Sequence, residues 1–178
     1  MRKNKGYSLI ELVVVIAIMA VVGTGIITLA YSQGSWKCRQ AATTVNNLLQ
    51  QTRSEALAKS NAWVKLSYDG TQCVLTSSFG KDYKLGKRVY ISYSTKSDGS
   101  GMVDLDGNPL VLTFTRGTGA FQTMKTGVTY DASGNILYTE AGTDVYCRVI
   151  HISGSKSGGK GYTITLHPVT GKFECEKD

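Results

Sequence analysis

The sequence predicts an α+β protein in which one long N-terminal α-helix packs on an antiparallel β-sheet domain. Three observations lead to this fold class. Residues 12–31 carry no charge, residues 38–56 repeat apolar positions at steps of three and four, and from Trp63 onward the apolar period is two. Steps of three and four are typical of a helix, and a period of two is typical of a strand.

The length and composition allow one domain of ordinary size after the N-terminal segment. The chain has 178 residues, 42% of them hydrophobic, and its 20 glycines suit a turn-rich β domain. The formal net charge is +7, but Arg2, Lys3 and Lys5 precede the apolar run, which leaves +4 for the remainder. Composition therefore indicates a nucleic-acid partner only weakly.

The uncharged run at residues 12–31 is long enough to cross a membrane, because twenty helical residues span a hydrocarbon core of roughly 30 Å. No signal-peptide cleavage pattern follows Ala30. The basic residues before the run predict a cytoplasmic N-terminus and an extracytoplasmic remainder, with Tyr31 and Trp36 as interfacial aromatics. Glu11, at the edge of the run, is a functional candidate, since an unpaired carboxylate there is costly.

The segment K-G-Y-S-L-I-E-L-V-V-V-I-A-I-M-A resembles the class III signal of type IV pilins and type II secretion pseudopilins. The resemblance implies cleavage after Gly6 by a prepilin peptidase and N-methylation of the new first residue, Tyr7. Glu11 then takes the fifth mature position, where its carboxylate can pair with the terminal amine of a neighbouring subunit and set helix register. Tyr7 replaces the commoner phenylalanine, and no proline interrupts the helix.

This resemblance divides the chain into three parts. Residues 1–6 are the leader peptide, 7–31 the transmembrane and filament-core helix, and 32–178 the extracytoplasmic globular domain of the pilin fold. The partners implied are the prepilin peptidase, other pilins or pseudopilins, and the inner-membrane assembly platform. The expected location is the bacterial cytoplasmic membrane, with the domain in an envelope or surface filament.

An amphipathic helix follows the apolar run and continues to about residue 60. Its apolar stripe comprises Cys38, Ala41, Val45, Leu48, Thr52 and Ala56, and polar residues that include Arg39, Asn46, Gln50 and Arg53 lie between them. Ser60 and Asn61 are expected to end the helix.

Strands are predicted from Trp63 onward. Val64, Leu66 and Tyr68 share one face of the first strand, and Asp69-Gly70 predicts a hairpin turn after it. Further strands are expected at Val89–Ser94, Leu110–Thr115, Val128–Tyr130, Val145–Ile152, Tyr162–His167 and Lys172–Cys175, between clusters of Gly, Asp, Asn and Ser.

Several of these segments resemble the GspH/FimT branch of minor pilins and pseudopilins. They are residues 48–66 at the junction of helix and first strand, the segments L-T-F-T-R-G and V-T-Y-D-A-S-G, and I-T-L-H-P-V-T-G-K near the end. In this branch the last turn often reads Gly-Arg-x-Arg, and in some members it contributes to DNA binding. Here it reads Gly171-Lys172-Phe173-Glu174, which replaces both arginines.

The four cysteines, Cys38, Cys73, Cys147 and Cys175, stand far apart and form no C-x-x-C pair, which excludes a zinc ribbon or a thioredoxin-type motif. In an extracytoplasmic domain they are candidate disulfide cysteines, and we expect oxidation. Hairpin counting places Cys147 and Cys175 about three residues out of register, so the connectivity stays open.

Two loops have a second interpretation. Residues 154–161 read G-S-K-S-G-G-K-G, close to a phosphate-binding loop, but they lack its final hydroxyl and lead into a strand, so a hairpin loop is favoured. The loop with Asp98, Asp104, Asp106 and Asn108 could hold Ca²⁺, although the glutamate that completes a calcium loop is absent and turn chemistry explains the residues.

No catalytic site is expected. His151 and His167 fall in predicted strands, and neither has a nucleophile and a third orienting group of the kind a triad needs. We therefore expect no enzyme, no cofactor and no metal, and a structural minor pilin or pseudopilin of a pilus, secretion or competence filament. The alternative is a DNA-binding minor pilin for DNA uptake, in which Lys156, Lys160 and Lys172 would contact phosphates.

Overall fold

The structure is a computed structural model that describes residues 9–58 and 61–178, without the side chains of 22–34. Its contacts form two compact units, Met1–Gly34 and Ser35–Asp178. One helix, α1 (Leu9–Leu57), contributes to both units, and all strands belong to the second. Gly6, Tyr7 and Ser60 lie outside the described residues.

The first unit presents helical residues with apolar side chains. Within residues 9–58 and 61–178, no helix combines the length and the apolar character needed to cross a membrane. The span expected at 7–31 begins outside the described residues and stays a prediction.

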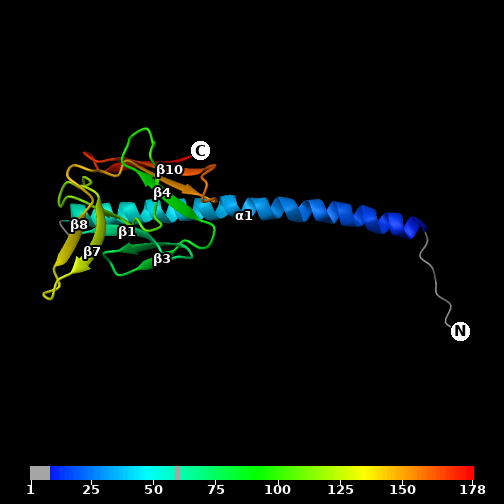
Figure 1. Cartoon of the computed structure of the whole chain (residues 1–178), viewed down its shortest axis with the longest axis horizontal. Helices are drawn as coiled ribbons and strands as arrows, with labels where there is room; N and C mark the ends of the chain where they lie inside the picture. Colours follow the sequence, from blue (N-terminus) through cyan, green and yellow to red (C-terminus); the bar gives the residue numbers. More distant parts are fainter. Residues whose placement is uncertain (1–8, 59–60) are drawn as a thin grey trace. The chain divides into compact units, whose positions relative to one another are not determined.

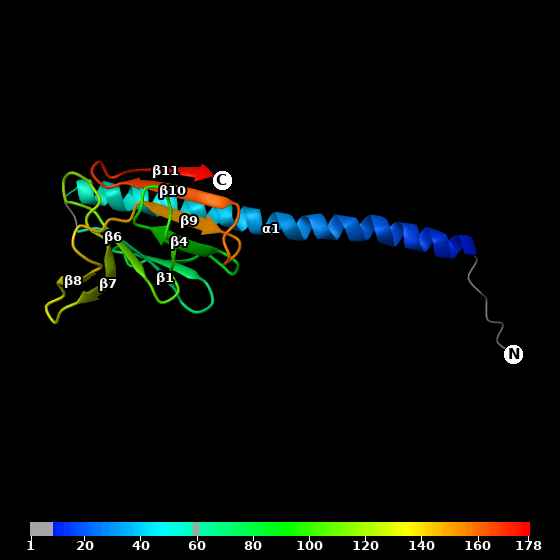
Figure 2. The ribbon, with the colours of Figure 1, turned by 45° about the horizontal axis from the view of Figure 1, so that its top comes forward.

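The second unit contains two antiparallel sheets (Figures 1 and 2). The six-stranded sheet has the order β3-β2-β1-β6-β7-β8, and its strands are β1 (Trp63–Tyr68), β2 (Cys73–Ser77), β3 (Asp82–Lys84), β6 (Leu110–Thr113), β7 (Lys125–Tyr130) and β8 (Ile136–Glu140). The five-stranded sheet has the order β11-β10-β9-β4-β5, and its strands are β4 (Tyr90–Ser94), β5 (Val103–Asp104), β9 (Val149–Ser153), β10 (Gly161–His167) and β11 (Lys172–Lys177).

The α+β class and the antiparallel pairing are therefore confirmed, and the β domain consists of two sheets. The alternation of apolar residues identifies a strand but does not show which other strand pairs with it. The pairing of β4 with β9, for example, joins residues far apart in the sequence, such as Ile91 and Ile152. The first hairpin forms as predicted: β1 pairs with β2, and Asp69 accepts hydrogen bonds from the backbone N–H groups of Thr71 and Gln72.

The predicted amphipathic stripe of the helix forms part of the core. All six of its residues are buried, including Val45 and Ala56 at 0% exposure. Ala41, Val45, Leu48 and Ala56 belong to one core cluster with apolar residues from both sheets, among them Leu66, Ile150 and Ile164. The helix within residues 35–57 is thus held by side chains from both sheets, as its stripe requires.

A close approach joins the turn between β10 and β11 to the loop that follows β6. The N–H of Phe121 donates to the carbonyl oxygen of Pro168 over 3.0 Å. Gly171, with φ of +64°, lies so close to this loop that a Cβ there would be 1.7 Å from the carbonyl oxygen of Gly119. This turn therefore requires glycine at position 171.

Candidate functional site

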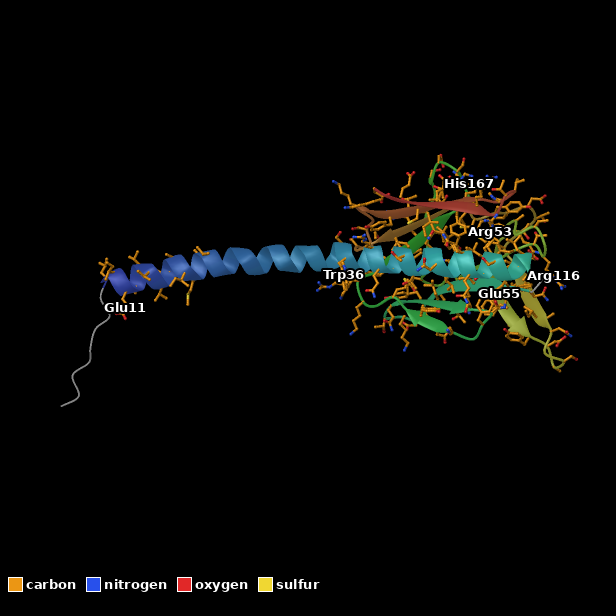
Figure 3. All side chains as sticks on the ribbon, turned by 180° about the vertical axis from the view of Figure 1, so that it is seen from behind. Glu11, Trp36, Arg53, Glu55, Arg116 and His167 are labelled. Carbon is orange, nitrogen blue, oxygen red and sulfur yellow. The ribbon has the colours of Figure 1, made fainter. Side chains whose placement is uncertain are left out.

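Glu11 lies in the first turn of α1 and is exposed. Figure 3 shows it at the start of the described helix. In the described part of the chain, no cation forms an ion pair with its carboxylate. An acidic group in the first turn suits the positive end of the helix dipole. The expected cleavage and methylation residues, Gly6 and Tyr7, lie outside the described residues, so their roles stay predictions.

The helical surface around Glu11 is apolar and uncovered. Large apolar side chains from Leu9, at 81% exposure, to Val21, at 74%, face outward on every side of the helix. The remaining members of this set are Ile10, Leu12, Val13, Val14, Val15, Ile16, Ile18 and Met19. A helix that is apolar all round is normally buried in lipid or protein. Residues 9–21 therefore require a covering that the chain does not supply among the described residues.

The four cysteines are free in the structure, and disulfide formation stays a prediction. Cys38, Cys73 and Cys147 are buried, whereas Cys175 is exposed on β11. Burial raises the pKa of the Cys73 thiol to about 11 and that of Cys147 to about 12, so neither is a nucleophile near neutral pH. In the sheet, Cys175 and Ile150 both pair with Ile164, so Cys147 stands out of register with Cys175.

The polar groups of the acidic loop at residues 98–108 form hydrogen bonds and an ion pair with other groups of the protein. Asp98 accepts a hydrogen bond from the N–H of Ser100, and Asn108 donates its amide N–H groups to the backbone oxygens of Asp104 and Asp106. Asp106 also pairs with Lys156, with 3.2 Å between Oδ2 and Nζ. Among the described residues, no three His, Cys, Asp or Glu side chains gather as a metal site would require.

The glycine-rich segment is the hairpin loop between β9 and β10, as predicted. Gly161 pairs with Ser153 at its base, and the chain continues as β10 rather than as a helix. Ser153 donates its hydroxyl to the backbone oxygen of Ser155 over 2.7 Å. A phosphate-binding loop needs a helix N-terminus at this point, so that interpretation does not fit.

His151 is part of a polar cluster on the five-stranded sheet. The Asp178 carboxylate accepts hydrogen bonds from Thr163 Oγ1 over 2.6 Å and from the N–H of Gly161 over 3.1 Å, and its Oδ2 lies 2.9 Å from His151 Nε2. Burial raises the pKa of Asp178, but these hydrogen bonds and the charge of His151 outweigh that effect, and its pKa is lowered. His167 is exposed at the end of β10. The cluster contains no nucleophile for a triad.

Arg53 was expected on the polar side of the helix, yet it is half-buried. Its Nη2 donates to the carbonyl oxygen of Thr170 over 3.1 Å, and Figure 3 shows it beside the sheet. It lines a cleft of about 330 Å³ between α1 and β11, together with Lys172 and Glu174. The only sequence signal for this position was its place next to the apolar stripe, at Thr52 and Ala56.

The N-terminal sequence resembles a known family. Residues 1–27 match the family described as the prokaryotic N-terminal methylation motif. This motif supports the type IV pilin-like prepilin family, whose members are structural rather than catalytic, and it indicates processing by a prepilin peptidase and assembly with other pilins. Comparison with curated proteins finds no match, and comparison with solved structures finds none.

Proposed function

We propose that the chain is a minor pilin or pseudopilin of the GspH/FimT type, a structural subunit of a pilus, secretion or competence filament. The observation that carries this proposal is the uncovered apolar surface of residues 9–21, interrupted by the single carboxylate of Glu11. Before assembly, lipid would cover this surface, and in a filament the same segments of neighbouring subunits would cover it.

The proposed roles follow from the methylation motif. Gly6 is the residue after which the prepilin peptidase cuts, and Tyr7 becomes the methylated N-terminus. Glu11 pairs with that terminal amine in a neighbouring subunit during assembly. The segment 7–31 is the membrane span, and residues 32–178 face outward from the cytoplasmic membrane. The inner-membrane assembly platform is the remaining partner.

Mass spectrometry of the chain tests this function after co-expression with a prepilin peptidase in a bacterial membrane. We expect a chain that begins at Tyr7 and carries one additional methyl group. An intact Met1 terminus, or cleavage after Ala30, would contradict the proposal, because either result describes an ordinary anchor or signal peptide.

The alternative, a DNA-binding minor pilin, has less support. Lys156 forms an ion pair with Asp106, and the carboxylate of Glu174 lines the same cleft as Lys172. A basic patch that binds phosphates would need lysine or arginine side chains that have no carboxylate beside them. An electrophoretic shift titration of the domain at two salt concentrations tests this alternative, and the absence of a shift at low salt would exclude it.

A further inference from the structure

The hairpin of β7 and β8 has two free edges. β8 stands at the end of the six-stranded sheet, and in the described part of the chain β6 pairs with β7 only through Val111 and Lys125. Beyond that pair, β7 and β8 form a two-stranded ribbon that projects from the domain in Figures 1 and 2. An isolated two-stranded ribbon is marginally stable in water, so a partner along one edge would stabilise it.

This ribbon lacks the charges that protect the other sheet edges. β3 carries Asp82 and Lys84, the two-residue strand β5 carries Asp104, and β11 carries Lys172, Glu174, Glu176 and Lys177. The one charge on β8 is Glu140 at the ribbon's base, where it pairs with the buried Lys125. Edge strands normally carry charges because charges prevent pairing with another chain. Among the described strands that end a sheet, β8 is therefore the one whose edge remains open to pairing.

The side chains of the ribbon also favour pairing. Val128 stands opposite Tyr138 and Tyr130 opposite Ile136, which gives one face an apolar ladder. Tyr130 is 58% exposed, and Leu137, on the other face, is 52% exposed. Aromatic and branched side chains at such positions stabilise cross-strand neighbours.

We propose that β8 of one copy pairs antiparallel with β8 of a second copy, centred on Tyr138. In this register Tyr138 faces Tyr138 of the partner, Leu137 faces Thr139, and Ile136 faces Glu140, so no two like charges are opposed. The charges of β3, β5 and β11 disfavour those edges as partners, so among the strands that end a sheet β8 itself is the complementary one.

The contact is small. Two five-residue strands bury less than the roughly 1,000 Å² that a specific interface in dilute solution needs. It therefore requires copies that are already concentrated in a membrane or filament, and in this respect it rests on the proposed function. Cross-linking in membranes tests it without requiring filament assembly or leader cleavage.

The test uses the full chain in membranes with Cys175→Ser, which removes the exposed thiol and leaves three buried ones. In this background, Tyr138→Cys should form a disulfide-linked dimer on mild oxidation about tenfold faster than Ser133→Cys, an exposed control at the ribbon's turn, because directly opposed strand residues lie within disulfide distance. A mixture of Leu137→Cys and Thr139→Cys copies, distinguished by tags, should cross-link faster than either variant alone.

A second variant tests the edge itself. Thr139→Lys in the Tyr138→Cys background should slow dimer formation, because it places a charge on the open edge. Equal rates of dimer formation for Tyr138→Cys and Ser133→Cys would overturn the proposal. The edge of the ribbon would then be available for a different protein and not for a second copy. Faster linkage of Leu137→Cys copies to one another than to Thr139→Cys would overturn the register. An uncut leader with intact cross-linking would contradict the pilin function and leave this contact standing.

Discussion

His151 Nε2 lies 2.9 Å from Asp178 Oδ2, and this contact joins β9 to the residue that follows β11. The same carboxylate accepts from Thr163 and from the backbone of Gly161, both on β10. One side chain thus connects three neighbouring strands of the five-stranded sheet. A carboxylate that accepts several hydrogen bonds is stabilised in its charged form. The contribution of these contacts to the stability of the folded protein should therefore depend on pH.

The stability contributed by Asp178 should be lost in acid. Its pKa in the folded protein is below the ordinary value of 3.8, so its contribution is fully present above that value and disappears as the pH falls through the lowered pKa. Asp178→Asn should therefore reduce the free energy of unfolding by about 1 kcal/mol at pH 7 and by progressively less as the pH is lowered below the ordinary pKa of 3.8. Urea unfolding at pH 7 and at a series of acidic pH values measures this, and an equal loss at every pH would contradict the charge-dependent explanation.

Gly171→Ala should be severely destabilising. A Cβ at this position would meet the carbonyl oxygen of Gly119 at 1.7 Å, so one of two backbone segments must move. We expect a loss of about 3 kcal/mol or more. Gly70→Ala is the matched control, because Gly70 has φ of +89° but no atom within 4 Å of its Cβ position, and it should cost about 1 kcal/mol.

Thermal unfolding compares the two variants. A loss in Gly171→Ala no larger than in Gly70→Ala would show that the β10–β11 turn does not approach the loop at Gly119. An equal loss in the two variants would also mean that a functional role, such as DNA binding, has to be considered again for the turn Gly171-Lys172-Phe173-Glu174. If the larger loss is found, the close approach to Gly119 and the positive φ of Gly171 together account for glycine at this turn.

The sequence predicted the elements that have a clear period. The stripe from Cys38 to Ala56 is buried, and β1 spans Trp63–Tyr68, where the period of two begins. The strands β3, β5 and β8 were missed. β3 and β5 have three and two residues, too few to show alternation, and the residues of β8, Ile136–Glu140, show no clear alternation of apolar and polar positions.

The apolar period of the sequence did not predict contacts between segments that lie far apart in the chain. Nothing in the period of the helix distinguishes Arg53, whose half-buried guanidinium meets Thr170, from Gln50, which is exposed. The division into two sheets and the cluster at Asp178 depend on pairings between distant segments. Local motifs succeeded where the chemistry is local, as in the turn after β1 and the N-terminal methylation motif.

Replacing Gly6 should abolish leader cleavage. With Gly6→Leu, a bulky side chain occupies the residue next to the bond to be cut, and the chain should retain its first six residues. Tyr7→Phe is the control, since phenylalanine is the commoner residue at this position of the resembling family, and its cleavage should be unchanged. Intact mass and mobility on a gel report both results. Normal cleavage of Gly6→Leu would show that the peptidase does not use this glycine.

Glu11 should govern assembly and leave the fold unchanged. It belongs to the compact unit Met1–Gly34, and none of the ion pairs found among the described residues involves it. Glu11→Ala removes a carboxylate that is costly at a membrane edge, so the subunit should insert at least as well as before. Leader cleavage and the thermal stability of residues 35–178 should not change.

The expected loss is in filament incorporation. If the Glu11 carboxylate pairs with the Tyr7 amine of a neighbour, both Glu11→Ala and the uncharged Glu11→Gln should reduce the amount of chain in sheared filaments, because neither can form that ion pair. Immunoblots of sheared and cell-bound fractions measure the ratio directly. A matched control is Gln51→Ala, an exposed residue of α1 in the other unit, which should incorporate normally. Undiminished incorporation of both Glu11 variants would remove the assembly role and leave Glu11 as a solvated residue at the head of an ordinary anchor.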